Sequence, residues 1–294
     1  MPKDQLALIK NALLAPVDAE GVYAGTELFE RVVEALSRFI NLYRPPTSEV
    51  LRFPPVMSRR QLELSGYLRS FPHLLGVVSC MHGSESEIRN VVEKQDWISA
   101  LAASDLVLAP AACYPVYPMA AARGYIPPDG LLFDVAAYCF RREASHEFDR
   151  LQAFRMREFV YLGTADQALE FRATWISRAE HLASLLHLPY EIVRASDPFF
   201  GRIGRLAAAS QIEQDLKFEL IVALQPESKP SACMSFNYHQ DHFATSWGLQ
   251  TASGSTAHTC CVAFGLDRLA LALFVTHGLE VQSWPATVRK HLSL

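Results

Sequence analysis

The chain has 294 residues, of which 50% are hydrophobic and 20% are charged, and its formal net charge is −4. This profile is typical of one large globular domain or two ordinary ones, and the acidic balance argues against a nucleic-acid partner, which would favour a basic face. No apolar segment reaches the roughly 18 residues needed to span a bilayer, and the N-terminus lacks the apolar core of a signal peptide. We therefore expect a cytoplasmic protein with no membrane association, whose six cysteines are thiols or metal ligands.

The first half of the chain is expected to begin with an amphipathic helix over residues 27–43. Apolar residues recur there at helical spacing, and two prolines follow at 45–46. The other elements expected in this half are a strand at 50–53, a short helix at 61–69, a buried strand at 74–80, a surface helix at 84–103, a strand at 106–109 and a helical turn at 119–123. The first helix and the strand 50–53 would form either a subunit interface or an ordinary part of the core.

The second half of the chain is expected to begin with a strand at 131–140. After it come a helix at 165–187, strands at 190–193, 220–224 and 259–264, and a helix at 266–276. Residues 235–243 are polar and aromatic, which favours a loop. Because helices do not alternate regularly with strands, we predict an α+β fold whose mostly antiparallel sheet is flanked by helices.

The stretch from Cys139 to Tyr161 has two apolar, strand-like ends and a charged middle. Arg141 and Glu143 stand two residues apart, so both side chains would project from one face of a strand. With Arg150 across a polar turn, they could bind a charged planar ligand, because a guanidinium suits phosphate and a carboxylate accepts the hydrogens of an amino group. Spacing alone leaves open the alternative of a hairpin with solvated charges.

Three stretches together resemble the motifs of class II aminoacyl-tRNA synthetases. The helix–strand unit that ends at Pro54-Pro55 is similar to the first motif, which builds a dimer. Residues 140–143, FRRE, match the FRxE of the second motif, and residues 265–268, GLDR, match the GxxR of the third. The resemblance implies a class II synthetase-like catalytic domain over residues 1–294, and a homodimer.

The second motif narrows the resemblance to seryl-tRNA synthetases, in which CFRxEA precedes RLxxF and a glutamate. Cys113 stands where ordinary seryl enzymes carry a glutamate, and the zinc-dependent seryl enzymes of methanogens carry cysteine there and again shortly before the third motif. The resemblance implies a zinc ion held by Cys113, Glu158 and Cys261, with one position open. Only one of two adjacent strand residues can face a site, and the spacing in related enzymes favours Cys261 over Cys260. Each cysteine alone would be interpreted as a small buried hydrophobe.

The chain lacks the parts with which a seryl-tRNA synthetase binds tRNA. Fewer than about thirty residues precede the first expected catalytic helix, too few for a coiled-coil arm, and nothing after Arg268 resembles an anticodon-binding domain. The chain is therefore most similar to bacterial amino acid:[carrier protein] ligases. This implies that glycine or alanine is activated by ATP as an aminoacyl-adenylate and transferred to the phosphopantetheine thiol of an acyl carrier protein, with Zn²⁺ and Mg²⁺ as cofactors and no tRNA.

The resemblance also assigns the ATP site. Arg141 at the α-phosphate and Arg268 at the γ-phosphate would be the catalytic residues, because the first step needs positioning and neutralised charge. Glu143 would accept the adenine amino group. The remaining ATP contacts implied are Arg150, Leu151 and Lys217.

The amino-acid pocket implied by the resemblance contains Glu158, Ala232, Cys233 and Met234, with Ser235 and Asn237 nearby. Cys233 and Met234 would leave room only for a very small side chain. Glycine and alanine differ by one methyl, worth about 1 kcal/mol, so the sequence leaves the choice between them open. The resemblance gives no metal role to His239, His242 or His258.

Three other functions are considered. The first is a small zinc-dependent seryl-tRNA synthetase-like enzyme or a tRNA-editing relative, and the second is a non-catalytic paralogue that serves as a binding or regulatory subunit. The third is a structural-zinc protein, although three ligands from three segments with no fourth suit an open site better. The presence of all three motif residues, Arg141, Glu143 and Arg268, disfavours the paralogue. Because helical carrier proteins are acidic, a basic docking patch is expected around Arg172, Arg178 and Arg194.

Overall fold

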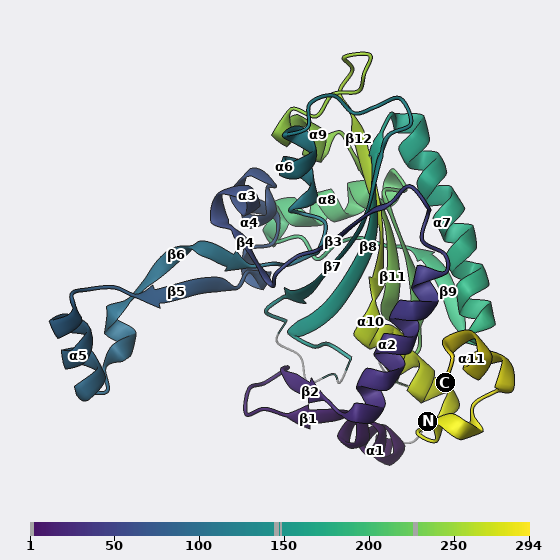
Figure 1. The fold of residues 1–294 in the computed structure, drawn as a ribbon, viewed down its shortest axis with the longest axis horizontal. Helices are drawn as coiled ribbons and strands as arrows, with labels where there is room; N and C mark the ends of the chain where they lie inside the picture. The colour runs from purple at the N-terminus through teal and green to yellow at the C-terminus, as the bar shows by residue number, and fades with distance from the viewer. Residues whose placement is uncertain (1–2, 144–146, 148, 226–228) are drawn as a thin grey trace.

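The computed structural model describes residues 3–143, 147, 149–225 and 229–294, so residues 144–146 and 148 of the predicted turn lie outside the described residues. A seven-stranded sheet with the strand order β3-β7-β8-β12-β11-β10-β9 forms the centre of the molecule (Figure 1). Its strands are β3 (Glu49–Arg52), β7 (Leu131–Phe140), β8 (Ala153–Gly163), β9 (Tyr190–Arg194), β10 (Lys217–Val222), β11 (Ser231–Gln240) and β12 (His258–Gly265). The β3–β7 pair is parallel and the other pairs are antiparallel. The predicted α+β arrangement is confirmed.

The predicted hairpin of the second motif is formed by β7 and β8, which pair continuously from Leu131↔Leu162 to Phe140↔Ala153. The strand β7 ends one residue before Arg141. The amide of Arg141 still donates to the Gln152 carbonyl, but the amide of Arg142 donates to Leu74 instead. The expectation that Arg141 and Glu143 share one face of a strand is therefore wrong, because the chain leaves the ladder between them.

One face of the sheet is covered by α2 (Glu27–Asn41), α7 (Ala165–Leu185) and α10 (Leu266–His277) (Figure 1). The apolar faces of these helices pack against Phe159, Val262 and Phe264 of the sheet. Two further helices, α1 (Lys3–Leu13) and α11 (Ala286–Leu292), contribute to the same core cluster. Thr164 and Gln167 start α7 with a capping box, in which each side chain accepts from the other's backbone amide. Burial of these apolar faces is the main force that holds the helices on the sheet.

The opposite face of the sheet packs against α6 (Val116–Ala121) and α9 (His242–Trp247). Tyr117 stacks on Phe243 with ring centroids 4.1 Å apart, and both belong to a second core cluster that includes Val160 and Cys261. Successive residues of a strand point to opposite faces. On β12, Cys261 therefore belongs to this second cluster, whereas Val262 belongs to the helix-covered one.

A three-stranded sheet projects from the body and carries α5 (Glu85–Glu93) at its tip, and we call this projection the β-arm (Figure 1). Its strand order is β4 (Val56–Ser58), β6 (Leu101–Leu108) and β5 (Val77–Met81). The predicted surface helix at 84–103 is wrong beyond Glu93, because a 3₁₀ turn (Trp97–Ala100) and β6 follow. The predicted buried strand at 74–80 is β5, which is largely exposed, since the β-arm leaves little structure to cover it. Gly66, with φ of 78°, divides the predicted helix at 61–69 into α3 (Arg59–Leu64) and α4 (Tyr67–Ser70).

Residues 235–243, predicted as a loop, form most of β11 and the start of α9. Helix α8 (Gly201–Glu213) occupies a segment predicted only as a connection, and the N-terminal hairpin β1 (Leu14–Pro16) and β2 (Tyr23–Gly25) was not predicted. Two further 3₁₀ turns lie at Pro72–Leu74 and Val281–Ser283. Within the described residues, no helix is both long and apolar enough to cross a membrane.

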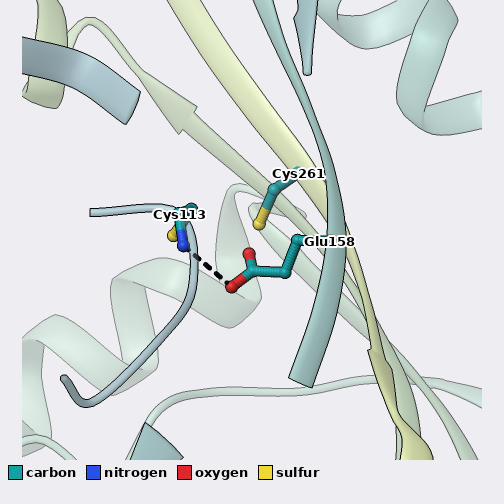
Figure 2. A group of neighbouring side chains, drawn as sticks. All are labelled: Cys113, Glu158 and Cys261. Carbon is teal, nitrogen blue, oxygen red and sulfur yellow. Dashed lines mark hydrogen bonds between the residues drawn. The ribbon is translucent and has the colours of Figure 1, made fainter. Parts of the chain in front are cut away.

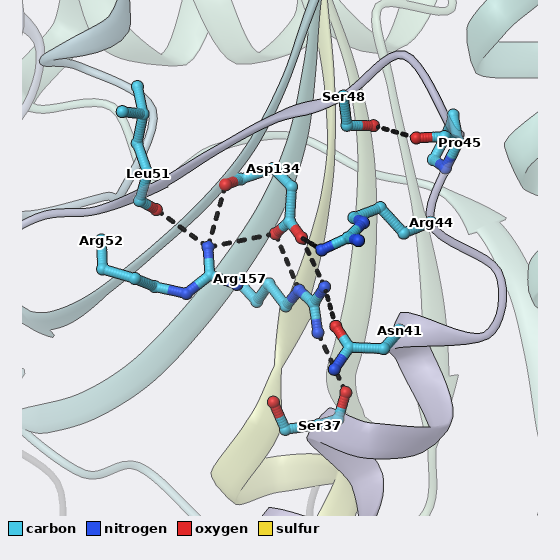
Figure 3. Close-up of polar contacts among 9 residues, drawn as sticks. All are labelled: Ser37, Asn41, Arg44, Pro45, Ser48, Leu51, Arg52, Asp134 and Arg157. Carbon is cyan, nitrogen blue, oxygen red and sulfur yellow. Dashed lines mark hydrogen bonds and ion pairs between the residues drawn. The ribbon is translucent and has the colours of Figure 1, made fainter.

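A buried ion pair fixes α2 to the sheet. Arg157 on β8 donates to both oxygens of Asp134 on β7, at 2.8 and 2.5 Å, and also to the Ser37 carbonyl and the Asn41 side chain at the end of α2 (Figure 3). Arg52 from β3 lies 3.3 Å from the same carboxylate. One carboxylate thus joins the helix–strand unit of the first motif to the hairpin of the second.

Replacing Asp134 by asparagine is expected to lower the free energy of unfolding by about 3 kcal/mol, because Arg157 would remain buried without a counter-charge. Urea unfolding followed by circular dichroism measures this loss. The matched control is Asp105→Asn, which makes the same change in an almost fully exposed carboxylate that pairs with Arg59 and is expected to alter stability little. Equal stability of the two variants would contradict a structural role for Asp134.

Candidate functional site

A cavity of about 410 Å³ opens on the sheet face that lies opposite α2, α7 and α10. It brings together eleven of the twelve residues that the sequence assigns to the site, and only Arg150 lies outside the lining. The eleven are Cys113, Arg141, Glu143, Leu151, Glu158, Lys217, Ala232, Cys233, Met234, Cys261 and Arg268. These residues come from four strands, a helix and two connecting segments. The motifs that the sequence separates by up to 155 positions therefore share one pocket.

Cys113, Glu158 and Cys261 meet at one wall of this cavity (Figure 2). One potential ligand atom from each lies within 4.8 Å of the other two, and all three residues are buried. The Oε1 atom of Glu158 accepts from the backbone amides of Ala112, at 2.8 Å, and Cys113, at 3.1 Å. These two bonds fix the carboxylate and leave its other oxygen for a ligand.

Strand alternation decides between the two adjacent cysteines. Cys261 lies opposite Val160 on β8, so the two side chains share one face of the sheet. Glu158 is two residues before Val160 on the same strand, so its side chain also points to that face, which lines the cavity. Cys260 points to the other face, where it packs with Ala168 and Tyr238. Of the two cysteines, Cys261 therefore lies on the cavity face.

The charges of this group fit a bound cation. Burial raises the pKa of the Glu158 carboxyl against hydrogen bonds that lower it. The hydrogen bond with Cys113, together with burial, raises the pKa of the Cys261 thiol. The same hydrogen bond lowers the pKa of the Cys113 thiol. Burial and the nearby Glu158 carboxylate outweigh that effect, so the pKa of Cys113 is also raised. Three crowded acids cannot all ionise unaided, whereas a divalent cation would stabilise all three anions. Two sulfurs and one carboxylate oxygen are ligands that suit Zn²⁺ and leave a fourth position open.

Two arginines also line the cavity. Arg268, in the first turn of α10, donates to the carbonyls of Asp149 (3.0 Å) and Ala232 (3.2 Å). Arg141 donates to the Pro110 carbonyl at 2.9 Å and lies over the Phe154 ring, 5.5 Å from its centroid. Both guanidiniums are thus held by neutral groups and keep their charge for an anionic ligand.

Asp267, next to Arg268, fixes the start of α10. Its carboxylate accepts from the backbone amide of Arg155 at 2.5 Å and from the guanidinium of the same residue at 3.0 and 2.6 Å. Arg155 also pairs with Glu30 on α2. This chain of ion pairs, which the sequence did not reveal, orients the third motif against the first two.

Glu143 and Arg150 form an ion pair with a 3.1 Å separation at the edge of the cavity. Arg150 also binds Glu147 at 2.5 Å, and it lies beside the cavity lining rather than in it. The neighbouring Leu151 is buried and lines the cavity. Glu143, Arg150 and Leu151 therefore lie together at the end of the hairpin.

Lys217 lines the cavity but is already paired. Its ammonium lies 2.6 Å from Asp197 and 2.9 Å from Glu219. Burial opposes its charge, but the two carboxylates outweigh burial and raise the pKa of Lys217. Since one cation faces two carboxylates, this cluster attracts a triphosphate less than Arg141 and Arg268 do.

Two irregularities of β11 shape the cavity wall. The first irregularity is at Cys233, which has no pairing partner on β10. The Cys233 sulfur contacts the carbonyl oxygens of Ser231 and Arg268. The second lies between Tyr238 and Gln240, at His239. Bulges re-aim side chains and are frequent next to active sites.

Asn237 and His239, not Cys233 or Met234, contact the Cys–Glu–Cys group. The Asn237 Nδ2 atom donates to the Cys261 sulfur at 3.3 Å, and the His239 Nε2 atom lies 3.6 Å from it. His239 has no role in the site predicted from the sequence, because the resemblance implies no metal role for it and residues 235–243 are predicted as a loop. The period-2 spacing of Ser235, Asn237 and His239 is the signal that would have placed them on one strand face.

The other two histidines lie elsewhere. The Nε2 atom of His242 binds the Ser65 carbonyl at 2.9 Å, and the Nδ1 atom of His258 lies 2.5 Å from the Tyr238 hydroxyl. Burial lowers the pKa of His239 to about 3, so this histidine is neutral. The three histidine side chains therefore have separate hydrogen-bond partners.

No protein-family model matches the chain. Among curated proteins, it is 55% identical over 297 residues to amino acid–[acyl-carrier-protein] ligase 1 of Bradyrhizobium diazoefficiens, with 100% of this chain and 90% of the relative covered. It is 54% identical to ligase 2 of the same organism, with 100% and 89% covered. A type-2 serine–tRNA ligase of Methanococcus maripaludis is 30% identical over 192 residues, which are 63% of this chain and 37% of that protein.

Solved structures show the same fold at low sequence identity. The M. kandleri seryl-tRNA synthetase, in complex with A. aeolicus tRNASec, superposes with a TM-score of 0.84 at 20% identity over 99% of this chain and 60% of that one. The Pyrococcus horikoshii seryl-tRNA synthetase complexed with ATP gives a TM-score of 0.69 at 17% identity. The class II catalytic fold predicted from the three motifs is confirmed. At 55% identity over its whole length, the chain belongs to the amino acid–[acyl-carrier-protein] ligase family.

Proposed function

We propose that this enzyme activates glycine or alanine with ATP and transfers the aminoacyl group to the phosphopantetheine thiol of an acyl carrier protein. The observation that carries the proposal is one cavity in which the Cys113–Glu158–Cys261 group lies together with Arg141 and Arg268. An amino acid bound at the Cys113–Glu158–Cys261 group and a triphosphate bound by the two arginines would meet inside this cavity. The names of the 55% and 54% identical relatives support a carrier protein as the acceptor.

In the first step, an oxygen of the amino acid carboxylate attacks the α-phosphorus of ATP and pyrophosphate leaves. Arg141 and Arg268 are proposed to neutralise the α- and γ-phosphates as charge moves onto them, and Mg²⁺ would accompany the triphosphate. Glu143 would accept the adenine amino group after releasing Arg150. Leu151 would cover the nucleotide. Lys217 is the weakest of the proposed ATP contacts, because Asp197 and Glu219 already balance its charge.

The amino acid is proposed to bind beside Cys113, Glu158 and Cys261. Zn²⁺ held by these residues would supply a fourth position for a neutral α-amino group. Ala232, Cys233 and Met234 would line the pocket toward Arg268, while Asn237 and His239 crowd the metal end. The crowding supports a substrate with little or no side chain.

In the second step, the phosphopantetheine sulfur attacks the acyl carbon and AMP leaves, while the thiol loses its proton. The phosphopantetheine group must reach the cavity from a docked carrier protein. Helix α8 is proposed as the docking surface, because Pro198 and Phe199 just before it line the cavity. Its Ile203 and Leu206 are 82% and 70% exposed, and exposed Arg202 and Arg205 lie beside them. A mixed apolar and basic face complements an acidic helical carrier.

The basic patch expected from the sequence is less suitable. Arg194 pairs with Asp215 at 2.6 Å, and Arg172 binds the carbonyl of the same residue. Arg178 lies over the Trp175 ring. These arginines have partners within the chain, whereas α8 presents apolar side chains to solvent.

Replacing Ile203 by aspartate is expected to raise the KM for the carrier about 30-fold, because a buried interface anchor is typically worth about 2 kcal/mol. Amino-acid-dependent ATP–pyrophosphate exchange, which needs no carrier, should stay at the wild-type rate. Ile98→Asp is the matched control, since Ile98 is 68% exposed but lies at the tip of the β-arm. Wild-type loading by the Ile203→Asp variant would place the docking surface elsewhere.

Residues 1–294 are proposed to form one catalytic unit that acts as a homodimer in the cytoplasm. Leu42 and Val50, on the helix–strand unit of the first motif, are exposed, and β3 is an edge strand whose partner is β7. A second copy would cover both residues. Sedimentation equilibrium is expected to give twice the chain mass. All six cysteines are free thiols, which suits a reducing compartment.

The proposed function is tested by ATP–pyrophosphate exchange with each of the twenty amino acids. Exchange with glycine or alanine is the expected result. Exchange with serine, followed by charging of tRNA, would support a seryl-tRNA synthetase-like enzyme instead. Absence of exchange with every amino acid would favour the non-catalytic paralogue.

A further inference from the structure

His239 occupies an unusual position on β11. The register shift between Tyr238 and Gln240 leaves it without a cross-strand partner on β12, and its ring turns toward the Cys–Glu–Cys group. Its Nε2 atom lies 3.6 Å from the Cys261 sulfur. The other ring nitrogen, Nδ1, lies 3.0 Å from the Thr259 hydroxyl and 3.5 Å from the Tyr117 hydroxyl. Phe243 packs edge-on against the ring, 4.9 Å away.

These contacts define which nitrogen carries the proton. Both neighbours of Nδ1 are hydroxyl groups, which can donate to it. A Cys261 thiolate that binds a metal has no proton and can only accept a hydrogen bond. The arrangement in which every group is satisfied has Thr259 donating to Nδ1 and the Nε2–H of His239 donating to the sulfur.

We propose that His239 is a positioning residue that holds the Cys261 thiolate as a metal ligand through an Nε2–H···S hydrogen bond. Asn237 provides a second N–H donor to the same sulfur at 3.3 Å. Two thiolates and one carboxylate carry three negative charges, one more than a divalent cation balances. N–H donors spread that excess charge and fix the orientation of the ligand, so they increase metal affinity. The proposal rests on the metal site of the proposed function.

The test compares two substitutions by metal affinity. The His239→Leu variant should bind Zn²⁺ about 10- to 100-fold more weakly than the wild type in competition with a chromogenic chelator. The His239→Gln variant keeps an N–H donor and should recover most of the affinity. In the Co²⁺-loaded protein, the thiolate-to-cobalt absorption band should shift in His239→Leu and stay close to its wild-type position in His239→Gln.

Two further variants keep the test decisive. Thr259→Val removes the nearer of the two hydroxyl partners of Nδ1 with little change in shape. It should also weaken Zn²⁺ binding, and it keeps the test informative if His239→Leu fails to fold. His258→Leu is the matched control, because this histidine binds Tyr238 outside the group, and it should bind Zn²⁺ as the wild type does.

Wild-type affinity and an unchanged cobalt band in His239→Leu would overturn the inference. Loss of a nitrogen ligand from the Co²⁺ spectrum in both His239 variants would overturn it in another way, since His239 would then bind the metal itself. A wild-type chain that binds no Zn²⁺ would instead contradict the metal site of the proposed function.

Discussion

Replacing Arg268 by alanine is expected to slow amino-acid-dependent ATP–pyrophosphate exchange by about 10³-fold, because the charge that develops on the phosphates would lose a fixed guanidinium. Carbonyls of Asp149 and Ala232 hold this side chain, so its position is set before ATP binds. The initial rate of exchange at saturating ATP and amino acid measures the loss.

Two controls separate chemistry from folding. Arg268→Lys keeps a charge without the guanidinium fork and should recover only part of the rate. Arg89→Ala removes an exposed arginine at the tip of the β-arm, where it pairs with Glu85, and should exchange like the wild type. If Arg268→Ala exchanged at the wild-type rate, the assignment of the third motif would be in error.

Replacing Cys261 by serine is expected to remove both bound Zn²⁺ and exchange activity. Losing a hydrogen bond to a metal ligand typically weakens metal binding about 10- to 100-fold, and losing the ligand itself should weaken it more. We therefore expect the affinity for Zn²⁺ to fall by more than about 100-fold. Metal content per chain, measured by atomic emission after gel filtration, reports the first effect, and pyrophosphate exchange reports the second.

The adjacent cysteine provides the matched control for this variant. Cys260 packs with Ala168 and Tyr238 on the opposite face of β12, so Cys260→Ser should keep both metal and activity. The reverse outcome, with metal lost from Cys260→Ser and kept by Cys261→Ser, would contradict the described orientation of β12.

Much of the site was predictable because it lies on strands with strong apolar patterns and regular spacing. The strand that contains Cys261 was predicted to within one residue at each end, and the first strand of the hairpin that contains Glu158 was predicted at 131–140, where β7 lies. A strand's period of two then determines which of Cys260 and Cys261 faces the cavity once the pairing register is known. The sequence alone left this choice to the spacing in related enzymes.

Other features were hidden because polar residues interrupt the apolar pattern. Strand β11 carries Ser235, Asn237 and His239 on its cavity face, so its sequence is typical of a loop although both of its neighbours are strands. The bulges at Cys233 and His239 depend on pairing with other strands and leave no mark in the local sequence. Helix α8 was missed for a similar reason, since glycines at 201 and 204 weaken its helical signal.

The buried ion pairs were also beyond sequence analysis. Arg157 and Asp134 are 23 residues apart, and Arg155 joins Glu30 and Asp267 across more than a hundred residues on each side. A charged residue on a strand is usually interpreted as exposed. Only the three-dimensional arrangement shows that these charges bind the three motifs to one another.

We expect a carrier protein, not tRNA, to accept the activated amino acid. The most direct measurement incubates the enzyme with ATP, radiolabelled glycine or alanine, and either a phosphopantetheinylated acyl carrier protein or tRNA, and follows label in the acid-precipitated product. The expected result is label on the carrier, which neutral hydroxylamine should release because the bond is a thioester, and no label on tRNA. Label on tRNA but not on the carrier would contradict it.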